Sequence, residues 1–458
     1  MIHIRSRRRR KGFLMILSLF ALTSALALTM VGLTRSVNEL TVANRFVASQ
    51  QSFALSEAGL DVGVHCLKWF GSQALSPQCA GSTPTCVFDL NQTALGAECT
   101  LPAAIRSNGA ISVLLDPADD NLTAHIKRYT IRATSSVNGV TDVRTVRYTW
   151  RLESFAKFGY FSNAETTEAG QRGYWVTGNV FQGPFHTNGQ LNLYGTPVFE
   201  GKTSSVSPTL NCPWGCTPDF QQGIQKPAPV IPLNALSINE VYNSATVRIT
   251  GDAAIELQGA SILVTTASGT TSYAVNDYPV VFVEGGNLTM AGGELDGQMT
   301  IATDGDILVA NHVRYHCDAE DPTDDVDCLD PSTGQVKYNN DFLGLVAKKN
   351  VRVVTSAPNN LVIQSSVMAV EGALKVDNYN DTTRGPRGTL HVFGGVSMKF
   401  GGFTGMFNGS GQMVSGYEEH HSYDDRFQSS SPPGFPTTGR YEAACWEDWR
   451  PGTPSRCP

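Results

Sequence analysis

The chain has 458 residues, of which only 16% are charged, and it contains 44 glycines. This length exceeds one ordinary compact core, so we expect two or three structural units, and the composition favours strands and turns over charged surface helices. The net charge of -7 is the sum of a strongly basic N-terminus and an acidic remainder. The acidic remainder argues against a protein that binds nucleic acid.

The N-terminus begins with a basic leader, residues 1–12, followed by an apolar run, residues 13–33, without a single charge. As a helix this run spans about 30 Å, enough to cross a bilayer. Basic residues before a membrane segment hold that end in the cytoplasm. We therefore predict a single-pass inner-membrane protein whose chain after Arg35 lies in the periplasm or outside the cell.

The helical pattern continues beyond the apolar run, since residues 36–70 contain no proline and few glycines. We therefore predict one helix over residues 13–70, apolar in its first half and amphipathic in its second. The apolar face expected for the second half consists of Leu40, Ala43, Phe46, Val47, Phe53, Ala54, Ala58, Val62 and Leu67.

Two short motifs in this helix resemble those of a known family. Arg10-Lys11-Gly12-Phe13 before an apolar run looks like the leader and cleavage site of type IV pilins and pseudopilins, and residues 53–60, FALSEAGL, are similar to a motif late in the helix of PilX-like minor pilins. The resemblance implies cleavage by a prepilin peptidase between Gly12 and Phe13, methylation of Phe13, and packing against other pilins or pseudopilins.

One position departs from the pattern of the major pilins. They carry glutamate at the fifth mature residue, where this chain has Leu17. The departure fits minor pilins and the tip pseudopilins of type II secretion, and the sequence does not choose between these two systems. A plain signal anchor spanning the membrane from Phe13 to Leu33 remains the alternative.

The ten cysteines are even in number, and several lie close together in the sequence. In an exported chain they predict disulfides, because the repeated short spacings of a zinc site are absent. The candidate pairs are Cys212 with Cys216, Cys317 with Cys328, and Cys445 with Cys457.

Residues 71–155 are predicted to contain stapled loops and a small antiparallel head. Alternating apolar and polar residues flank Asn138-Gly139, a dipeptide that strongly indicates a hairpin, and residues 110–115 supply a further strand. This sheet can pack on the second half of the long helix.

Residues 156–430 contain short apolar runs separated by Gly, Asn and Asp, which predict a β-solenoid or β-helix-like domain. No exact repeat length emerges, so a two-sheet sandwich remains open. The fold class is therefore mainly β with one long N-terminal α-helix. Expected strands are residues 280–283, 288–290, 299–301, 307–309, 343–346, 351–354, 361–363, 390–393 and 396–400.

Motifs in the second half resemble an uncharacterised β-rich domain of large PilX-like pilus-assembly proteins. They include residues 183–189, GPFHTNG, residues 341–347, DFLGLVA, and residues 423–426, YDDR. This resemblance spans about residues 155–450 and implies a pilus or cell-surface setting without a known activity. Residues 431–458 are expected to form a disulfide-closed tail.

No cofactor is expected, and one acidic loop is a weak calcium candidate. Its oxygen ligands would be Asp318, Glu320, Asp321, Asp324 and Asp325. The loop lacks the glycine-centred spacing of an EF-hand, so the alternative is a solvated surface loop.

The function that the sequence favours is a minor pilin or pilus-assembly component, structural or adhesive and not an enzyme. Two alternatives remain open. One is a membrane-anchored β-helix enzyme acting on polysaccharide through carboxylate pairs such as Glu294 with Asp296 or Asp304 with Asp306. The other is a surface adhesin that never enters a pilus.

Overall fold

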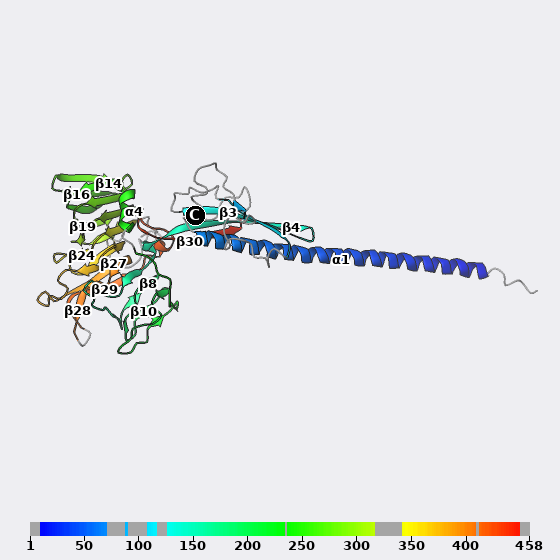
Figure 1. The fold of residues 1–458 in the computed structure, drawn as a ribbon, viewed down its shortest axis with the longest axis horizontal. Helices are drawn as coiled ribbons and strands as arrows, with labels where there is room; N and C mark the ends of the chain where they lie inside the picture. The colour runs from blue at the N-terminus through cyan, green and yellow to red at the C-terminus, as the bar shows by residue number, and fades with distance from the viewer. Residues whose placement is uncertain are drawn as a thin grey trace, which may run out of the picture. The chain divides into compact units, whose positions relative to one another are not determined.

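The computed structural model describes residues 10–70, 88–89, 108–116, 126–233, 236–316, 341–408 and 412–448. The chain is mainly β with one long N-terminal helix, as expected (Figure 1). It divides into two compact units, which we describe separately. Unit 1 comprises Met1–Arg151 and Tyr441–Pro458, and unit 2 comprises Leu152–Arg440.

Unit 1 consists of a long helix and a five-stranded sheet with the strand order β1-β2-β3-β4-β30. Its elements are α1 (Arg10–Phe70), β1 (Phe88–Asp89), β2 (Ala110–Asp116), β3 (Ile126–Val137), β4 (Val140–Ser154) and β30 (Thr437–Asp448). The predicted hairpin is confirmed. Asn138 and Gly139 have φ values of 50° and 76°, as a two-residue primed turn requires.

The C-terminal segment differs from the expected tail. Residues 437–448 form β30, which lies beside β4 at the edge of the sheet. Arg151 and Glu442 join these two strands through an ion pair of 2.7 Å. The sequence did not predict this strand, because it pairs with a segment almost 300 residues earlier, and no local pattern reveals such a partner.

The second half of α1 packs on β2 and β3, but through a different face from the predicted one. Phe46, Val47 and Phe53 are exposed. The buried face consists mainly of small residues, and its members are Ala48, Ser52, Leu55, Ser56, Gly59, Leu60 and Gly63.

Small residues are needed because the helix backbone lies close to the sheet. A Cβ on Gly59 would lie 2.7 Å from Ile111 Cδ1 and 2.8 Å from Val113 Cγ2. Ser52 and Ser135 are buried together, and Ser135 Oγ donates a 2.6 Å hydrogen bond to the Ser52 carbonyl. The apolar pattern therefore predicted the wrong face, because it does not count Ser and Gly, which form much of the docking face, as apolar positions.

Unit 2 is built from successive turns of the chain, which we call coils. Its short strands pair mostly in parallel, each with a strand of a neighbouring coil. The strands of its longest sheet are β14 (Val247–Thr250), β18 (Val280–Glu284), β20 (Gln298–Thr303), β23 (Phe342–Ala347), β25 (Leu361–Ala369), β27 (Pro386–Phe400), β5 (Tyr160–Ala164), β8 (Phe185–Thr187), β11 (Thr203–Ser205) and β13 (Ile224–Gln225).

Two further parallel sheets complete the coils. They use β15 (Ala253–Gly259), β19 (Leu288–Leu295), β21 (Ile307–Val309), β22 (Val313–Tyr315), β24 (Val351–Val353), β26 (Leu374–Val376) and β29 (Met413–Ser422), together with the first halves of β25 and β27.

The remaining elements are smaller. They are β6 (Trp175–Val176), β7 (Val180–Phe181), β9 (Leu193–Tyr194), β10 (Val198–Phe199), β12 (Asp219–Phe220), β16 (Ser261–Thr266), β17 (Gly269–Ala274), β28 (Gly405–Phe407), α4 (Leu236–Ser244), and the 3₁₀ helices η5 (Phe155–Lys157) and η6 (Asp425–Gln428). The predicted strands from residue 280 onward coincide with observed strands, except that Val354 lies one residue beyond the end of β24.

The register explains why no exact repeat was visible in the sequence. Ile301 pairs with Val281, 20 residues earlier, but with Leu345, 44 residues later. A coil of about 20 residues is therefore lengthened by insertions, such as the antiparallel hairpin of β16 and β17. Alternate side chains of each strand face the interior, so Val281, Val283 and Ile301 belong to one continuous core.

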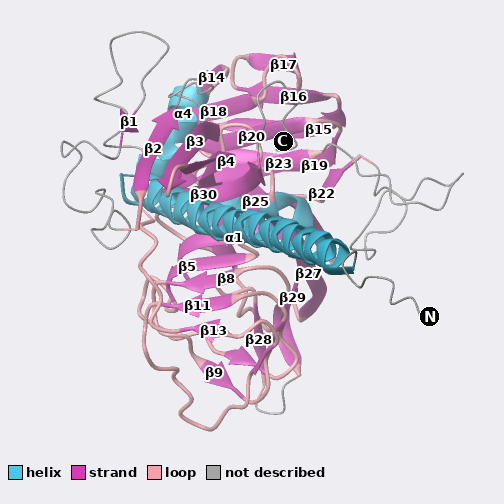
Figure 2. Ribbon diagram, turned by 90° about the vertical axis from the view of Figure 1, so that its right-hand side faces the viewer, coloured by secondary structure: helices cyan, strands magenta, loops and turns pink. Residues whose placement is uncertain are grey.

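The order of the coils does not follow the chain. β5 pairs with the end of β27, and β8, β11 and β13 then stack onward from β5. The chain next returns to the opposite end at β14 and stacks coils back toward β5; Figure 2 shows β14 and β13 at opposite ends of unit 2.

The segment that leads back to β14, which includes Ile231 and α4, covers the outer face of the longest sheet. Ile231, Ile238 and Val241 form a second core with outward side chains such as Phe282 and Phe161. Asn188 fixes this segment, since its Oδ1 accepts a hydrogen bond from Ile231 N at 3.0 Å and its Nδ2 donates to the Ile231 carbonyl at 2.6 Å.

Candidate anchoring and assembly surface

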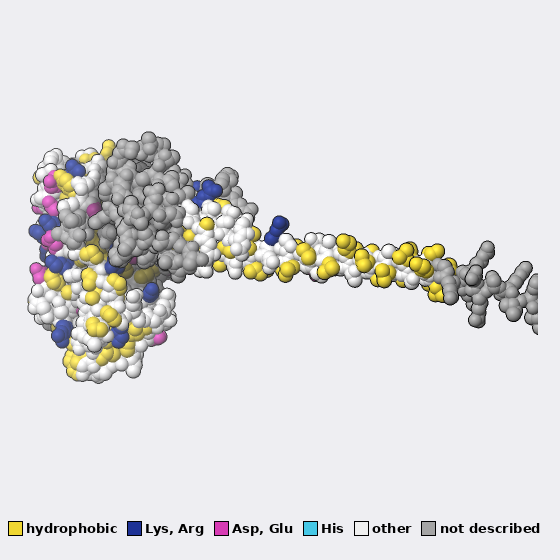
Figure 3. All heavy atoms as spheres, turned by 45° about the vertical axis from the view of Figure 1, so that its right-hand side comes forward, with side chains coloured by type: hydrophobic (Ala, Val, Ile, Leu, Met, Phe, Trp, Pro, Cys, Tyr) yellow, Lys and Arg dark blue, Asp and Glu magenta, His cyan; other side chains and the backbone are white. Residues whose placement is uncertain are grey.

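The first half of α1 exposes a continuous apolar surface. Phe13, Leu17 and Leu33 have exposed fractions of 67%, 56% and 66%. Figure 3 shows hydrophobic side chains along the length of this segment. In the described part of the chain, α1 is the one helix long and apolar enough to cross a membrane. Such an exposed patch requires a bilayer or another apolar partner.

Four hydroxyl groups within or just after the apolar run bond to their own helix. Ser18, Thr23, Thr29 and Thr34 each donate a hydrogen bond of 2.6–3.0 Å to a carbonyl three or four residues earlier. A hydroxyl that bonds its own helix adds little cost inside hydrocarbon, because that donor is paired. These four residues therefore do not interrupt the apolar character of the segment.

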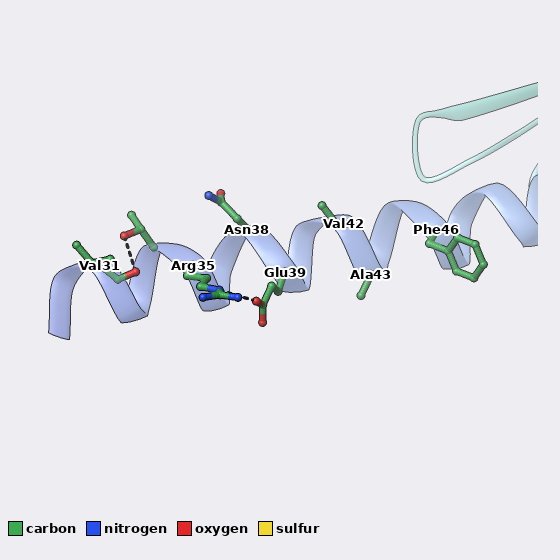
Figure 4. Close-up of a pocket in the computed structure, with 8 residues that line it drawn as sticks. Val31, Arg35, Asn38, Glu39, Val42, Ala43 and Phe46 are labelled. Carbon is green, nitrogen blue, oxygen red and sulfur yellow. Dashed lines mark hydrogen bonds and ion pairs between the residues drawn. The ribbon is translucent and has the colours of Figure 1, made fainter. Parts of the chain in front are cut away.

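The first described charges after the apolar run neutralise each other. Arg35 Nε lies 3.0 Å from Glu39 Oε1, one helical turn away, and both side chains are exposed. Figure 4 shows the two side chains directed toward each other, with Val31, Val42 and Phe46 on the same helix around them. An exposed pair of this kind contributes little to stability, but it allows this turn to carry no net charge.

The second half of α1 is held by an arginine that sequence analysis missed. Arg144 of β4 bonds Glu57 at 2.9 Å and lies 3.7 Å from Asp448 of β30. Its guanidinium also covers the Phe53 ring, 4.7 Å from the centroid. Residues 53–60, singled out as a motif, thus supply the groups that dock α1 on the sheet.

The remaining predicted site residues fall into three groups. Gly12 and Phe13, the predicted cleavage position, lie in the first turn of α1. Cys212 and Cys216 form a disulfide, and Cys445 is also disulfide-bonded. The calcium candidates Asp318, Glu320, Asp321, Asp324 and Asp325, together with Cys317, Cys328 and Cys457, lie outside the described residues.

Two of the carboxylates considered for an enzyme, Asp304 and Asp306, accept hydrogen bonds from neighbouring parts of the chain. Asp304 accepts hydrogen bonds from Gly285 N at 2.9 and 3.0 Å, and Asp306 bonds Asn350 and Arg352. Burial raises the pKa of Asp306, but the hydrogen bonds from Asn350 and Arg352 outweigh it and lower the pKa. Within the described ranges, no group of three or more His, Cys, Asp or Glu is arranged to hold a metal ion.

One buried carboxylate stands out in unit 2. Glu165 is 6% exposed and accepts hydrogen bonds from Ser162 Oγ and from Trp175 Nε1, the latter at 3.1 Å. Burial raises its pKa, although these hydrogen bonds act in the opposite direction. The folded state therefore binds the carboxyl proton more tightly than the unfolded chain does.

This shift predicts a pH dependence of stability that Glu165→Gln should remove. As the pH rises from the ordinary glutamate pKa through the raised one, the wild-type free energy of unfolding should fall relative to that of Glu165→Gln, and the difference should then level off. Urea unfolding between about pH 4 and pH 8 measures this. The exposed Glu168→Gln is the control. A constant difference between Glu165→Gln and wild type would contradict the prediction.

Comparison with known proteins gives a match to a family model and a similarity to a solved structure. A family model described as a domain of unknown function, DUF4900, matches residues 123–216. The competence-associated pilin ComZ from Thermus thermophilus is similar in structure at 12% identity, covering 87% of this chain and 97% of ComZ, with a TM-score of 0.38. No curated protein matches the chain significantly.

Proposed function

We propose that this chain is a minor pilin or pilus-assembly component, inserted in the inner membrane through α1 and displaying its β units outside the cytoplasm. The observation that carries the proposal is the division of α1 into two halves. The first half exposes large apolar side chains on all sides, whereas the second half is docked on the sheet of unit 1. A domain released into water would leave these apolar side chains exposed to solvent.

The same helix suits transfer from a bilayer into a filament. Leu14, Ile16 and Leu22 are exposed in the free chain and can contact either lipid or neighbouring helices. Leu17 stands where a major pilin carries glutamate, which supports a minor or tip position. In this proposal, prepilin peptidase and other pilins or pseudopilins are the partners, and the role is structural or adhesive without catalysis.

The proposal predicts the mature N-terminus. Mass spectrometry of sheared surface filaments should find a chain that starts at N-methylated Phe13. Gly12→Asp should block the cleavage, keep residues 1–12 attached and retain the chain in the membrane fraction. Ser6→Asp, which also places an acidic residue in the leader but away from the cleavage position, is the matched control and should be processed like wild type.

Three other results would contradict or narrow the proposal. A surface chain that starts at Met1 would leave an anchored adhesin outside any pilus. A chain cut after Leu33 would leave a secreted β-rich protein. Processing at Phe13 without the chain in filaments would limit its role to the assembly machinery.

A further inference from the structure

A cluster of three aromatic rings, of which Trp214 and Tyr194 are exposed and Tyr174 is half-buried, lies in the coils formed by residues 173–218 of unit 2. Trp214 is 67% exposed and Tyr194 is 48% exposed. The Trp214 ring lies 5.1 Å from Tyr174 and 5.9 Å from Tyr194 between centroids. We propose that this cluster, which we call the aromatic platform, binds sugar rings of a neutral polysaccharide.

The platform is held in place before any ligand arrives. Trp214 lies in the short loop closed by the Cys212–Cys216 disulfide, and Gly215 turns this loop with φ 88°. Gly195 N donates to the Gly215 carbonyl at 3.3 Å, and Thr217 N donates to the Gly195 carbonyl at 2.8 Å. These hydrogen bonds hold the loop against the end of β9, which carries Tyr194. A rigid platform loses little conformational entropy on binding.

The position of these rings is unusual for the unit. Most other aromatic side chains in these coils face the interior: Phe181 stacks on Phe199 at 5.4 Å, and Phe199 stacks on Phe220 at 5.0 Å. The interior ladder stabilises the coils by burying ring area. Trp214 is not buried in this way, although tryptophan carries the largest apolar surface of any side chain. Its exposure indicates a binding partner.

The chemistry around the rings selects an uncharged polar partner. Residues 173–179, 189–198 and 206–218, which carry the platform, contain no charged side chain. Their polar groups are amides and hydroxyls: Asn211 Nδ2 lies 3.5 Å from Tyr174 Oη, and Gln190 Nε2 donates to Thr209 Oγ1 at 2.9 Å. A pyranose ring offers a matching surface, with an apolar C–H face for stacking and a rim of hydroxyls for hydrogen bonds.

Nucleic acid is the other polymer that stacks on aromatic rings, but it requires basic side chains along its phosphates. In the described part of the chain, the cation–π pairs of arginine and lysine are with other rings, such as Tyr242 and Tyr417. The charge pattern therefore favours a neutral glycan over single-stranded DNA.

The test uses the full-length chain in detergent with defined probes. Dextran, laminarin, galactomannan and soluble chitin oligomers are titrated while tryptophan fluorescence and affinity electrophoresis report binding. At least one of these neutral glycans should bind, with little change when the salt concentration is raised. Trp214→Ala and Tyr194→Ala should each weaken that binding by about tenfold or more, as the loss of a central aromatic anchor does.

Trp446→Ala is the matched control, since it removes another exposed tryptophan, 51% accessible, from unit 1. It should leave glycan binding unchanged, and circular dichroism should show that all three variants stay folded. The proposal is overturned if none of the four probes binds, if Trp214→Ala binds as well as wild type, or if an oligo-dT probe binds more tightly than the glycans and is released by salt. Each outcome is independent of whether the chain enters a filament.

Discussion

Gly293→Ala is expected to destabilise unit 2 by about 3 kcal/mol or more, the largest effect of any single methyl group that we foresee. Gly293 lies in β19 with φ 104°, a conformation that alanine rarely adopts and that costs about 1–3 kcal/mol. A Cβ there would also collide with the Leu257 carbonyl oxygen of the paired strand β15. Backbone cannot give way as a side-chain tip can, so overpacking adds a cost of similar size.

Gly173→Ala is the matched control for this prediction. It lies in the same unit, has no positive φ value, and a Cβ there meets nothing within 4 Å. Its effect should stay within about 0.5 kcal/mol. Urea titration followed by peptide-resolved hydrogen exchange separates the strands of unit 2 from the rest of the chain. Equal stability of the two variants would show that β15 and β19 are not paired as described.

Leu60→Ala is expected to destabilise unit 1 by about 3 kcal/mol. Leu60 is 4% exposed on the face of α1 that packs on the sheet. Its truncation removes buried apolar area and leaves a cavity that the small neighbours Ser56, Gly59 and Gly63 cannot fill. Hydrogen exchange should accelerate in β3, the strand that contacts α1 most extensively.

Leu40→Ala makes the same chemical change on the exposed part of α1, where Leu40 is 63% accessible. The stability of unit 1 should not change. If the proposed filament role is right, Leu40→Ala should nevertheless reduce the amount of chain in sheared filaments, since this side chain would contact a neighbouring helix. The pair of variants thus separates folding from assembly. Loss of unit 1 stability in Leu40→Ala would contradict the observed docking face.

Local sequence patterns determined much of this protein. The apolar run of residues 13–33 predicted the exposed half of α1, because length and absence of charge are properties of one segment. Asn138-Gly139 predicted the hairpin of β3 and β4, because the turn itself dictates the backbone angles. The strands after residue 280 were visible for the same reason, since each short apolar run is bounded by its own turn residues.

Long-range pairing was decided only in the tertiary structure. The partner of β30 is β4, and the partner of β5 is β27, and in each pair the strands are more than 200 residues apart. Neither segment carries a mark of its partner, because parallel and edge pairings are made by backbone groups that all residues share. The same holds for the stacking order of the coils, in which the first coils of unit 2 follow the last ones.

Close packing was likewise beyond the sequence. The docking face of α1 uses Ser52, Ser56 and Gly59, residues that an apolar pattern treats as gaps. The aromatic platform brings Tyr174, Tyr194 and Trp214 together from three successive coils, although in the sequence they look like isolated aromatics. The sequence determines which segments become helices, turns and strands, since those depend on neighbouring residues; the fold alone decides which small or aromatic side chains meet, since that depends on the distance between backbones.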